Sequence, residues 1–168
     1  MVMGSCEICF GQKQDYHVLN PLPSFYPDQL AETKVTGHFG NSAIFKDVDS
    51  IPPGIDFIEH LEKAVGKCKI FLVVIGDKWL EATGSTRTSR LHDPRDFVRI
   101  EIEAALSRNI LIVPLLVRGA SLPAEEKLPP SLRKLVYRNA MSIRPDPDFH
   151  RDMDRLIAAI SNYARQKP

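Results

Sequence analysis

A glutamate in the middle of an apolar helix face is the residue of this sequence best placed to do chemistry. The segment Asp93–Arg108 reads DPRDFVRIEIEAALSR, and Asp93 followed by Pro94 predicts a helix start with Asp93 as the N-cap. At about 100° of rotation per residue, Glu101 shares its helix face with apolar neighbours. These are Phe97, Val98, Ala104 and Ala105. A charged carboxylate there is costly unless it is paired, and catalytic carboxylates occupy this kind of environment.

Glu101 has two interpretations from helical periodicity alone. It is either a catalytic carboxylate in an apolar setting or a structural glutamate that is salt-bridged to Arg108 at the rim of the core. Glu103, which lies two residues further on, points the opposite way and is expected to be solvated. Glu103 is therefore an internal control for any test of Glu101.

Acidic residues at the end of a predicted strand form a second candidate group. In the segment IFKDVDSIPPGIDF (residues 44–57), a strand runs into Asp47, and a Pro-Pro-Gly turn ending at Gly54 then opens a helix. Gly54 permits a positive φ or the close approach of another backbone. Carboxylates at a strand's carboxyl end suit ribose hydroxyls, and a helix N-terminus suits a phosphate. The commoner alternative is a Pro-Gly loop with solvated aspartates.

Strands that alternate with helices must position these side chains. Two apolar runs rich in β-branched residues, Lys69–Gly76 and Asn109–Val117, predict strands of a parallel sheet that is covered on both faces. Weaker strands are expected at 42–48 and 139–143, and helices at 28–35, 54–65, 97–106 and 153–160, with Gly66 as a C-cap just past the second helix. This rhythm predicts an open α/β sheet, whose sites form outside the carboxyl ends of the strands.

Two irregular segments and the single tryptophan follow those strands. The segment Gly84–Asp96 is polar and long enough to be a functional loop, and Ala120–Pro130 is a second long connection. Trp79 comes three residues after the strand at 69–76. It either lines a pocket or caps the core, and the core is the commoner place for such a residue.

Composition excludes several classes of function. The chain has 168 residues with 22 basic and 21 acidic side chains, which suits one domain and provides no basic field for nucleic acid. Three cysteines disfavour a disulfide scaffold, and Cys6 and Cys9 lack the second pair of a zinc site, so both are expected to be plain thiols. No apolar run reaches the ~20 residues that span a bilayer. These features predict a soluble cytoplasmic domain with no metal and no membrane partner.

Three stretches together resemble the Toll/interleukin-receptor (TIR) domain in its bacterial NADase form. They are IFKDVDSIPPGIDFIEHLEKAVGKCKIFLVVIGDKWL, DPRDFVRIEIEAALSRNILIVPLLV and LPPSLRKLVYRNAMSI. The resemblance implies a flavodoxin-like, three-layer α/β fold with a mostly parallel five-stranded sheet. Residues 37–163 would form the TIR core. The divergent segment 1–36 would add the first strand and helix to the same single domain, with Tyr16–Leu19 as the candidate strand.

The same resemblance implies an activity. Enzymatic TIR domains cleave NAD⁺ to nicotinamide and ADP-ribose, or to cyclic isomers of it. They use a glutamate four positions after an aromatic residue, and Phe97 and Glu101 match that pair with Phe in place of Trp. Glu101 would be catalytic, and NAD⁺, as substrate and without a further cofactor or metal, would contact Phe97, Asp47, Gly54 and Trp79. A productive arrangement requires Glu101 to open into a cleft bordered by Asp47, Trp79 and Phe97.

Self-association is the second property that the resemblance implies. Residues 47–55 match the family's BB loop, in which Ile51, Pro52, Pro53 and Gly54 would contact another TIR domain. A neighbouring protomer would complete the pocket, so clustering would switch on an immune-type effector. The alternative is a non-catalytic TIR interaction module, and the missing first-loop arginines of the family favour it. A response-regulator receiver is disfavoured, because the strand ending at Ile75 carries no phosphoacceptor aspartate.

Overall fold

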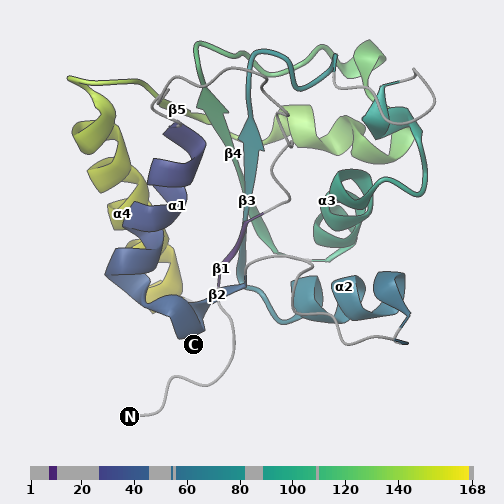
Figure 1. The fold of residues 1–168 in the computed structure, drawn as a ribbon, viewed down its shortest axis with the longest axis horizontal. Coiled ribbons are helices and arrows are strands. Elements are labelled where there is room, and N and C mark those ends of the chain that lie inside the picture. The colour runs from purple at the N-terminus through teal and green to yellow at the C-terminus, as the bar shows by residue number, and fades with distance from the viewer. Residues whose placement is uncertain are drawn as a thin grey trace.

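A parallel sheet of five strands runs through the computed structural model, which describes residues 8–10, 27–45, 54, 56–81, 89–108 and 110–166 (Figure 1). The strands are β1 (Ile8–Phe10), β2 (Ile44–Phe45), β3 (Ile70–Ile75), β4 (Leu111–Val117) and β5 (Met141–Ile143). Their order is β2-β1-β3-β4-β5, and every neighbouring pair is parallel. This is the flavodoxin-like strand order, so the predicted fold class is confirmed.

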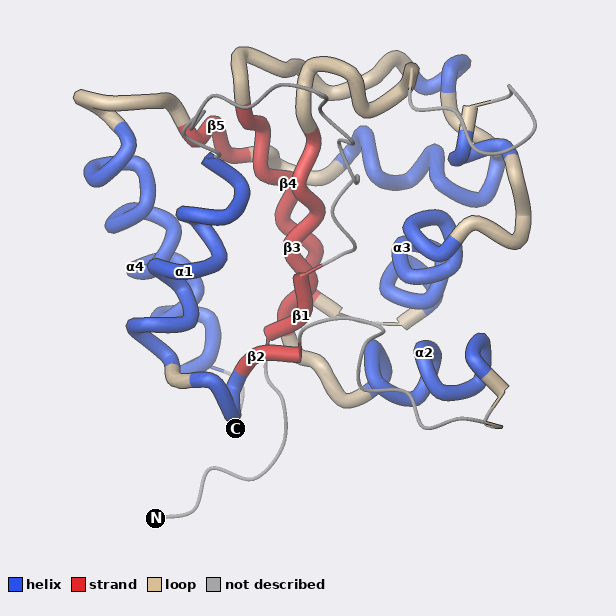
Figure 2. The backbone as a smooth tube through the Cα atoms, in the orientation of Figure 1, coloured by secondary structure: helices blue, strands red, loops and turns tan. Residues whose placement is uncertain are grey.

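Helices cover both faces of this sheet. Figures 1 and 2 show α1 (Pro27–Phe39) and α4 (Phe149–Gln166) on one face, and α2 (Phe57–Gly66) and α3 (Phe97–Ser107) on the other. Two 3-10 segments, η3 (Arg90–His92) and η5 (Pro130–Tyr137), contact α3. Two further 3-10 segments are η1 (Asn41–Ala43) and η4 (Glu125–Lys127). The arrangement has the three layers that the sequence predicted.

Alternation along β3 divides the core into two clusters. Phe71, Val73 and Ile75 belong to the cluster that contains side chains of α2 and α3. Ile70 and Leu72 belong to the cluster that contains side chains of α1 and α4. Because β3 is buried on both faces, its sequence is a continuous apolar run rather than an alternating one.

The N-terminal part of the chain supplies a strand to the middle of the sheet. The strand β1 occupies residues 8–10, whereas the candidate strand Tyr16–Leu19 lies outside the described residues. The helix α1 is longer than the expected 28–35 and crosses the position, between residues 36 and 37, at which the sequence had placed a boundary. A strand of three residues is too short to show a hydrophobic period, so β1 can be identified only by its pairing with β2 and β3.

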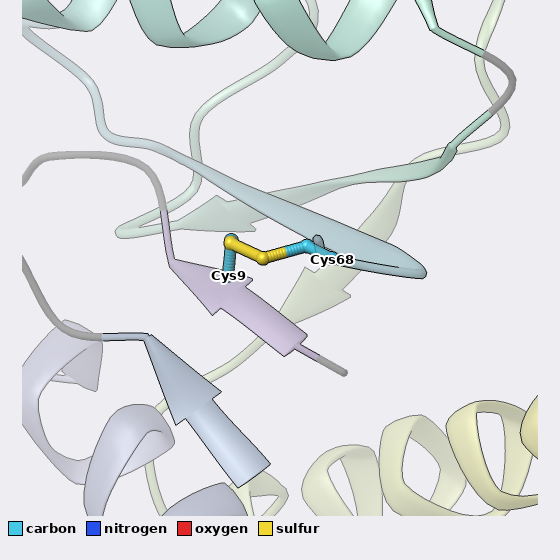
Figure 3. The surroundings of a disulfide bond; sticks show 2 residues. All are labelled: Cys9 and Cys68. Atoms are coloured by element: carbon cyan, nitrogen blue, oxygen red, sulfur yellow. A yellow bond between two sulfur atoms is a disulfide. The ribbon is translucent and has the colours of Figure 1, made fainter. Parts of the chain in front are cut away.

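A disulfide joins β1 to the segment just before β3. Cys9 and Cys68 are bonded, with their Cα atoms 6.0 Å apart, a usual separation for a disulfide (Figure 3). The interpretation of Cys9 as a plain thiol is therefore wrong. The pair was hidden because its members lie 59 positions apart, and only the parallel alignment of β1 with β3 brings them together.

Two smaller features complete the fold. Gly66 is the last residue of α2 and does not adopt the positive φ of a C-cap glycine, so that prediction is wrong. A Cβ atom at Gly66 would lie 3.2 Å from Nε of Arg108, so the glycine makes room for that side chain. None of the helices in the described ranges combines the length and the apolar character that crossing a bilayer requires.

Candidate functional site

The start of α3 is held by an aspartate cap. Asp96 is the N-cap residue, and its Oδ1 accepts a hydrogen bond of 3.0 Å from the backbone N–H of Val98. Nε of Arg90 donates to Oδ2 of Asp96 at 2.6 Å, which ties η3 to the same turn. The prediction that Asp93 caps the helix is wrong. Oδ1 of Asp93 instead accepts a hydrogen bond of 2.9 Å from the backbone N–H of Arg95, in the turn that precedes the helix.

Glu101 is buried on the inner face of α3, as the helical periodicity predicted. Only 2% of its surface is exposed. Val98, Ile102 and Ala105 of the same helix belong to the apolar cluster between α3 and the sheet. Within the described residues, Glu101 and Asp152 are the two buried charged side chains. A low-dielectric environment of this kind strengthens the interaction of a carboxylate with any positive charge that develops beside it.

Glu103 faces outward and stabilises the packing of α3 against its neighbours. Its Oε1 accepts from Nε of Arg99 at 2.6 Å and from the hydroxyl of Ser131 at 2.5 Å. Arg99 also donates to the backbone carbonyl oxygens of Leu91 and His92. Glu103 is thus on the outer face, as predicted, but it is ion-paired rather than simply solvated.

A cleft of about 770 Å³ opens at the carboxyl edge of β3 and β4. The end of β3 with the turn that follows it forms one wall, and the segment after β4 forms another. Ser89 and His92, which come before α3, complete the described lining. Open α/β sheets bind ligands outside this carboxyl edge, and the switch point of this strand order lies next to the cleft, between β1 and β3.

The cleft brings together some of the predicted site residues and not others. Trp79 borders it, although its indole is only 5% exposed and packs in the core cluster, so both predicted roles apply in part. Glu101 and Phe97 are not among the described residues that line the cleft. Phe97 is 38% exposed at the first turn of α3, one turn before Glu101. Within the described part of the chain, Glu101 therefore does not open into this cleft.

Gly54 has the backbone conformation that the sequence anticipated. Its φ is +86°, and a Cβ atom placed there would meet nothing within 4 Å, so conformation rather than crowding favours glycine. Oδ1 of Asp56 accepts from the backbone N–H of Glu59 at 3.0 Å near the start of α2, a contact the sequence reasoning missed. Asp47, Ile51, Pro52 and Pro53 lie outside the described residues.

Sequence reasoning also missed most of the residues that line the cleft. Gly119–Lys127 contributes much of the lining, and the sequence had marked 120–130 only as a long connection. The position of this segment in the sequence could have identified it. It follows β4 directly and therefore must pass the carboxyl edge of the sheet, where ligands bind.

Comparison with known proteins agrees with the fold and assigns the family. Two of the solved structures that are similar to this chain contain TIR domains. One is the TIR domains of the activated Roq1 resistosome that directly recognises the pathogen effector XopQ, with a TM-score of 0.60, 11% identity, and coverage of 93% of this chain and 99% of that one. The other is a metazoan TIR-STING receptor from C. gigas in complex with 2′,3′-cGAMP, with a TM-score of 0.56, 16% identity and coverage of 94% of this chain.

The chain spans 40% of the length of the TIR-STING receptor. No curated protein matches it in sequence. A family model for the TIR domain matches residues 34–158, which is most of the chain. By that match, and in agreement with the parallel sheet order described above, this chain belongs to the TIR domain family.

Proposed function

We propose that this chain cleaves the nicotinamide–ribose bond of NAD⁺ and acts as a cytoplasmic immune effector that is switched on by self-association. The observation that carries the proposal is the placement of Phe97 and Glu101 one helical turn apart on α3 of a TIR domain, which is the spacing of the enzymatic members. With 2% of its surface exposed, Glu101 lies in a low-dielectric setting that would strengthen its interaction with a positive charge beside it. The same burial means that the proposal requires a movement that opens Glu101 to the substrate.

The chemistry requires little more than that charge. Breaking the nicotinamide–ribose bond leaves an oxocarbenium-like carbon, as in glycoside hydrolysis, while the cationic nicotinamide departs as a neutral molecule. Glu101 would stabilise the positive charge and hold the ribose hydroxyls. Phe97, which is partly exposed, would pack against the flat ring. Water, or the adenine of the same molecule, would then capture the ribosyl carbon.

Access to Glu101 would depend on assembly. With 2% of its surface exposed, Glu101 cannot contact a substrate until the start of α3 or its surroundings move. Binding of a second TIR domain at the predicted BB loop, residues 47–55, would shift the equilibrium toward a conformation in which Glu101 is accessible. Asp47, Gly54 and Trp79 would then contribute to the substrate pocket. Activity is consequently expected to rise more steeply than linearly with protein concentration.

A specific observation also favours a second candidate, a non-catalytic TIR interaction module. The cleft at the carboxyl edge is bordered by Trp79, whereas Glu101 does not belong to its described lining. Under this alternative Glu101 serves the packing of α3. The domain would then recruit other TIR domains through the predicted BB loop without turning over NAD⁺.

One experiment separates the two candidates. Nicotinamide release from NAD⁺ is measured by chromatography over a range of protein concentrations, and self-association is followed by sedimentation on the same samples. The wild type is compared with Glu101→Gln, and Glu103→Gln serves as the matched control on the same helix. Release by wild type and Glu103→Gln, but not by Glu101→Gln, supports the enzyme. Self-association without release at any concentration identifies the interaction module.

A further inference from the structure

The Cys9–Cys68 disulfide spans a short junction of the sheet, the one between β1 and β3. In the described sheet, β2 has β1 as its only strand neighbour, and β1 connects to the rest through β3. The strand β1 has three residues and β2 has two, whereas β3 and β4 pair over six positions. Backbone pairing between the β2–β1 edge and the remainder of the sheet is therefore limited to the three positions Ile8, Cys9 and Phe10.

Apolar packing holds the same edge from one side. Ile8 and Ile44 pack in the cluster that contains Ala31 and Val35 of α1. On the other side, Cys9 and Cys68 both lie in the cluster beneath α2 and α3. The two sulfur-bearing residues are 1% and 4% exposed. The disulfide is thus the covalent link at a junction that is otherwise held by a short strand pairing and side-chain contacts.

We propose that Cys9 and Cys68 form a redox-responsive tether for the β2–β1 edge of the sheet. The oxidised pair fastens β1 to the start of β3, and the reduced pair leaves the edge attached by strand pairing and packing alone. A link that closes a loop across 59 positions removes much conformational freedom from the opened chain, so it has a large effect on opening.

The redox step is a thiol–disulfide exchange. Two protein thiols lose two electrons and two protons as the sulfur–sulfur bond forms, and a low-molecular-weight disulfide such as oxidised glutathione accepts them and leaves as two thiols. The intermediate is a mixed disulfide with one of the two cysteines. Because both residues are buried, exchange requires the edge to open first, which couples the chemistry to the motion that the tether restrains.

The tether has a consequence for the proposed NAD⁺ site, and this consequence alone rests on the proposed function. The strand β2 leads directly into the segment that carries Asp47 and Gly54. A fastened edge would fix the end of β2 from which that segment begins. Oxidised protein would then cleave NAD⁺ faster than reduced protein, whereas the tether itself is measurable without any substrate.

The test uses the full chain prepared with oxidised glutathione and then with a reducing agent. Mass spectrometry of the oxidised sample is expected to find Cys9 and Cys68 joined to each other with glutathione on neither, and thiol counting in denaturant to find three free thiols in the reduced sample. Reduction should lower the melting temperature by about 5–15 °C. Amide hydrogen exchange should become about tenfold faster or more at 8–10 and 44–45, with β4, β5 and α4 little changed.

Variants provide the controls. Cys68→Ser should reproduce the reduced state under oxidising conditions, and Cys6→Ser should behave as wild type. If Cys68→Ser does not fold, reduction of the wild type makes the same comparison. Three free thiols after oxidation, or exchange that rises evenly through β4 and β5, would overturn the proposal. Loss of the redox effect on NAD⁺ cleavage, with the exchange effect intact, would overturn only the link to activity.

Discussion

Two buried carboxylates, Asp152 and Glu101, lie on helices that cover opposite faces of the sheet. Asp152, in the first turn of α4, is 1% exposed and accepts three hydrogen bonds from Arg144. These come from the backbone N–H at 3.1 Å, Nε at 2.8 Å and Nη2 at 2.7 Å. They hold the pKa of the Asp152 carboxyl at about 2, below its ordinary value of 3.8, against the effect of burial. Glu101, equally buried, lies on the apolar face of α3 between helix and sheet.

Asp152 shows that burial alone does not identify a catalytic carboxylate, because its burial accompanies an ion pair with Arg144. Arg144 follows β5 and Asp152 begins α4, so their ion pair fixes the connection between a strand and the next helix. Loss of a carboxylate with this structural role should lower the free energy of unfolding. Loss of a carboxylate that serves the proposed reaction should lower the rate of NAD⁺ cleavage. Variants of Asp152 and Glu101 should therefore differ in these two measurements.

The largest expected effect is on activity at Glu101. Glu101→Gln keeps the size of the side chain and removes its charge, so nicotinamide release should fall by about 100-fold or more. The free energy of unfolding should change by less than about 1 kcal/mol, because the amide no longer buries a charge. Chromatographic assay and urea denaturation measure the two quantities. A stability loss without a change in rate would place Glu101 in the same structural class as Asp152.

The next effect is on stability at Asp152. Asp152→Asn should lower the free energy of unfolding at pH 7 by about 2 kcal/mol, because the hydrogen bonds from Arg144 to a charged acceptor are weakened. NAD⁺ cleavage by the folded protein should stay at the wild-type level. Asp154→Asn, an exposed position on the same helix, is the matched control and should have little effect in urea denaturation.

The pH dependence of the difference in unfolding free energy between wild type and Asp152→Asn tests whether charge is the cause. A carboxyl whose pKa is lowered by folding stabilises the protein fully above its unfolded pKa, and the contribution is lost as the pH falls through the folded value. The stability gap between wild type and Asp152→Asn should thus persist at pH 5 and shrink steadily between about pH 4 and pH 2. Urea denaturation across this range measures it. A gap of constant size would show that charge is not its origin.

The smallest effect is expected at Glu103. Its contacts with Arg99 and Ser131 are partly exposed, so Glu103→Gln should cost about 0.5–1 kcal/mol of stability. The rate of NAD⁺ cleavage should be unaffected, since the side chain faces away from Glu101. A rate loss comparable to that of Glu101→Gln would mean that the two glutamates act through the position of α3 rather than through charge.

The central strands and the inner face of α3 could be predicted from local sequence. The apolar runs that became β3 and β4, and the 3.6-residue period that buries Glu101, are properties of neighbouring residues and can be found without a fold. The positive φ of Gly54 is equally local. The sequence analysis predicted Asp93 as the cap of α3, and the structure has Asp96, because an aspartate suits an N-cap at either position and only the turn at 93–96 decides where the helix begins.

Contacts between residues far apart in the sequence depend on the tertiary fold. Cys9 and Cys68 pair because parallel β1 and β3 align segments 59 positions apart, and the three residues of β1 form a strand because β2 and β3 flank them. The cleft likewise joins the end of β3 to residues after β4. Such contacts depend on how the strands of the whole sheet are aligned, and no single stretch of sequence reveals that alignment. Periodicity could therefore predict that Glu101 is buried, whereas its separation from the cleft lined by Trp79 required the fold.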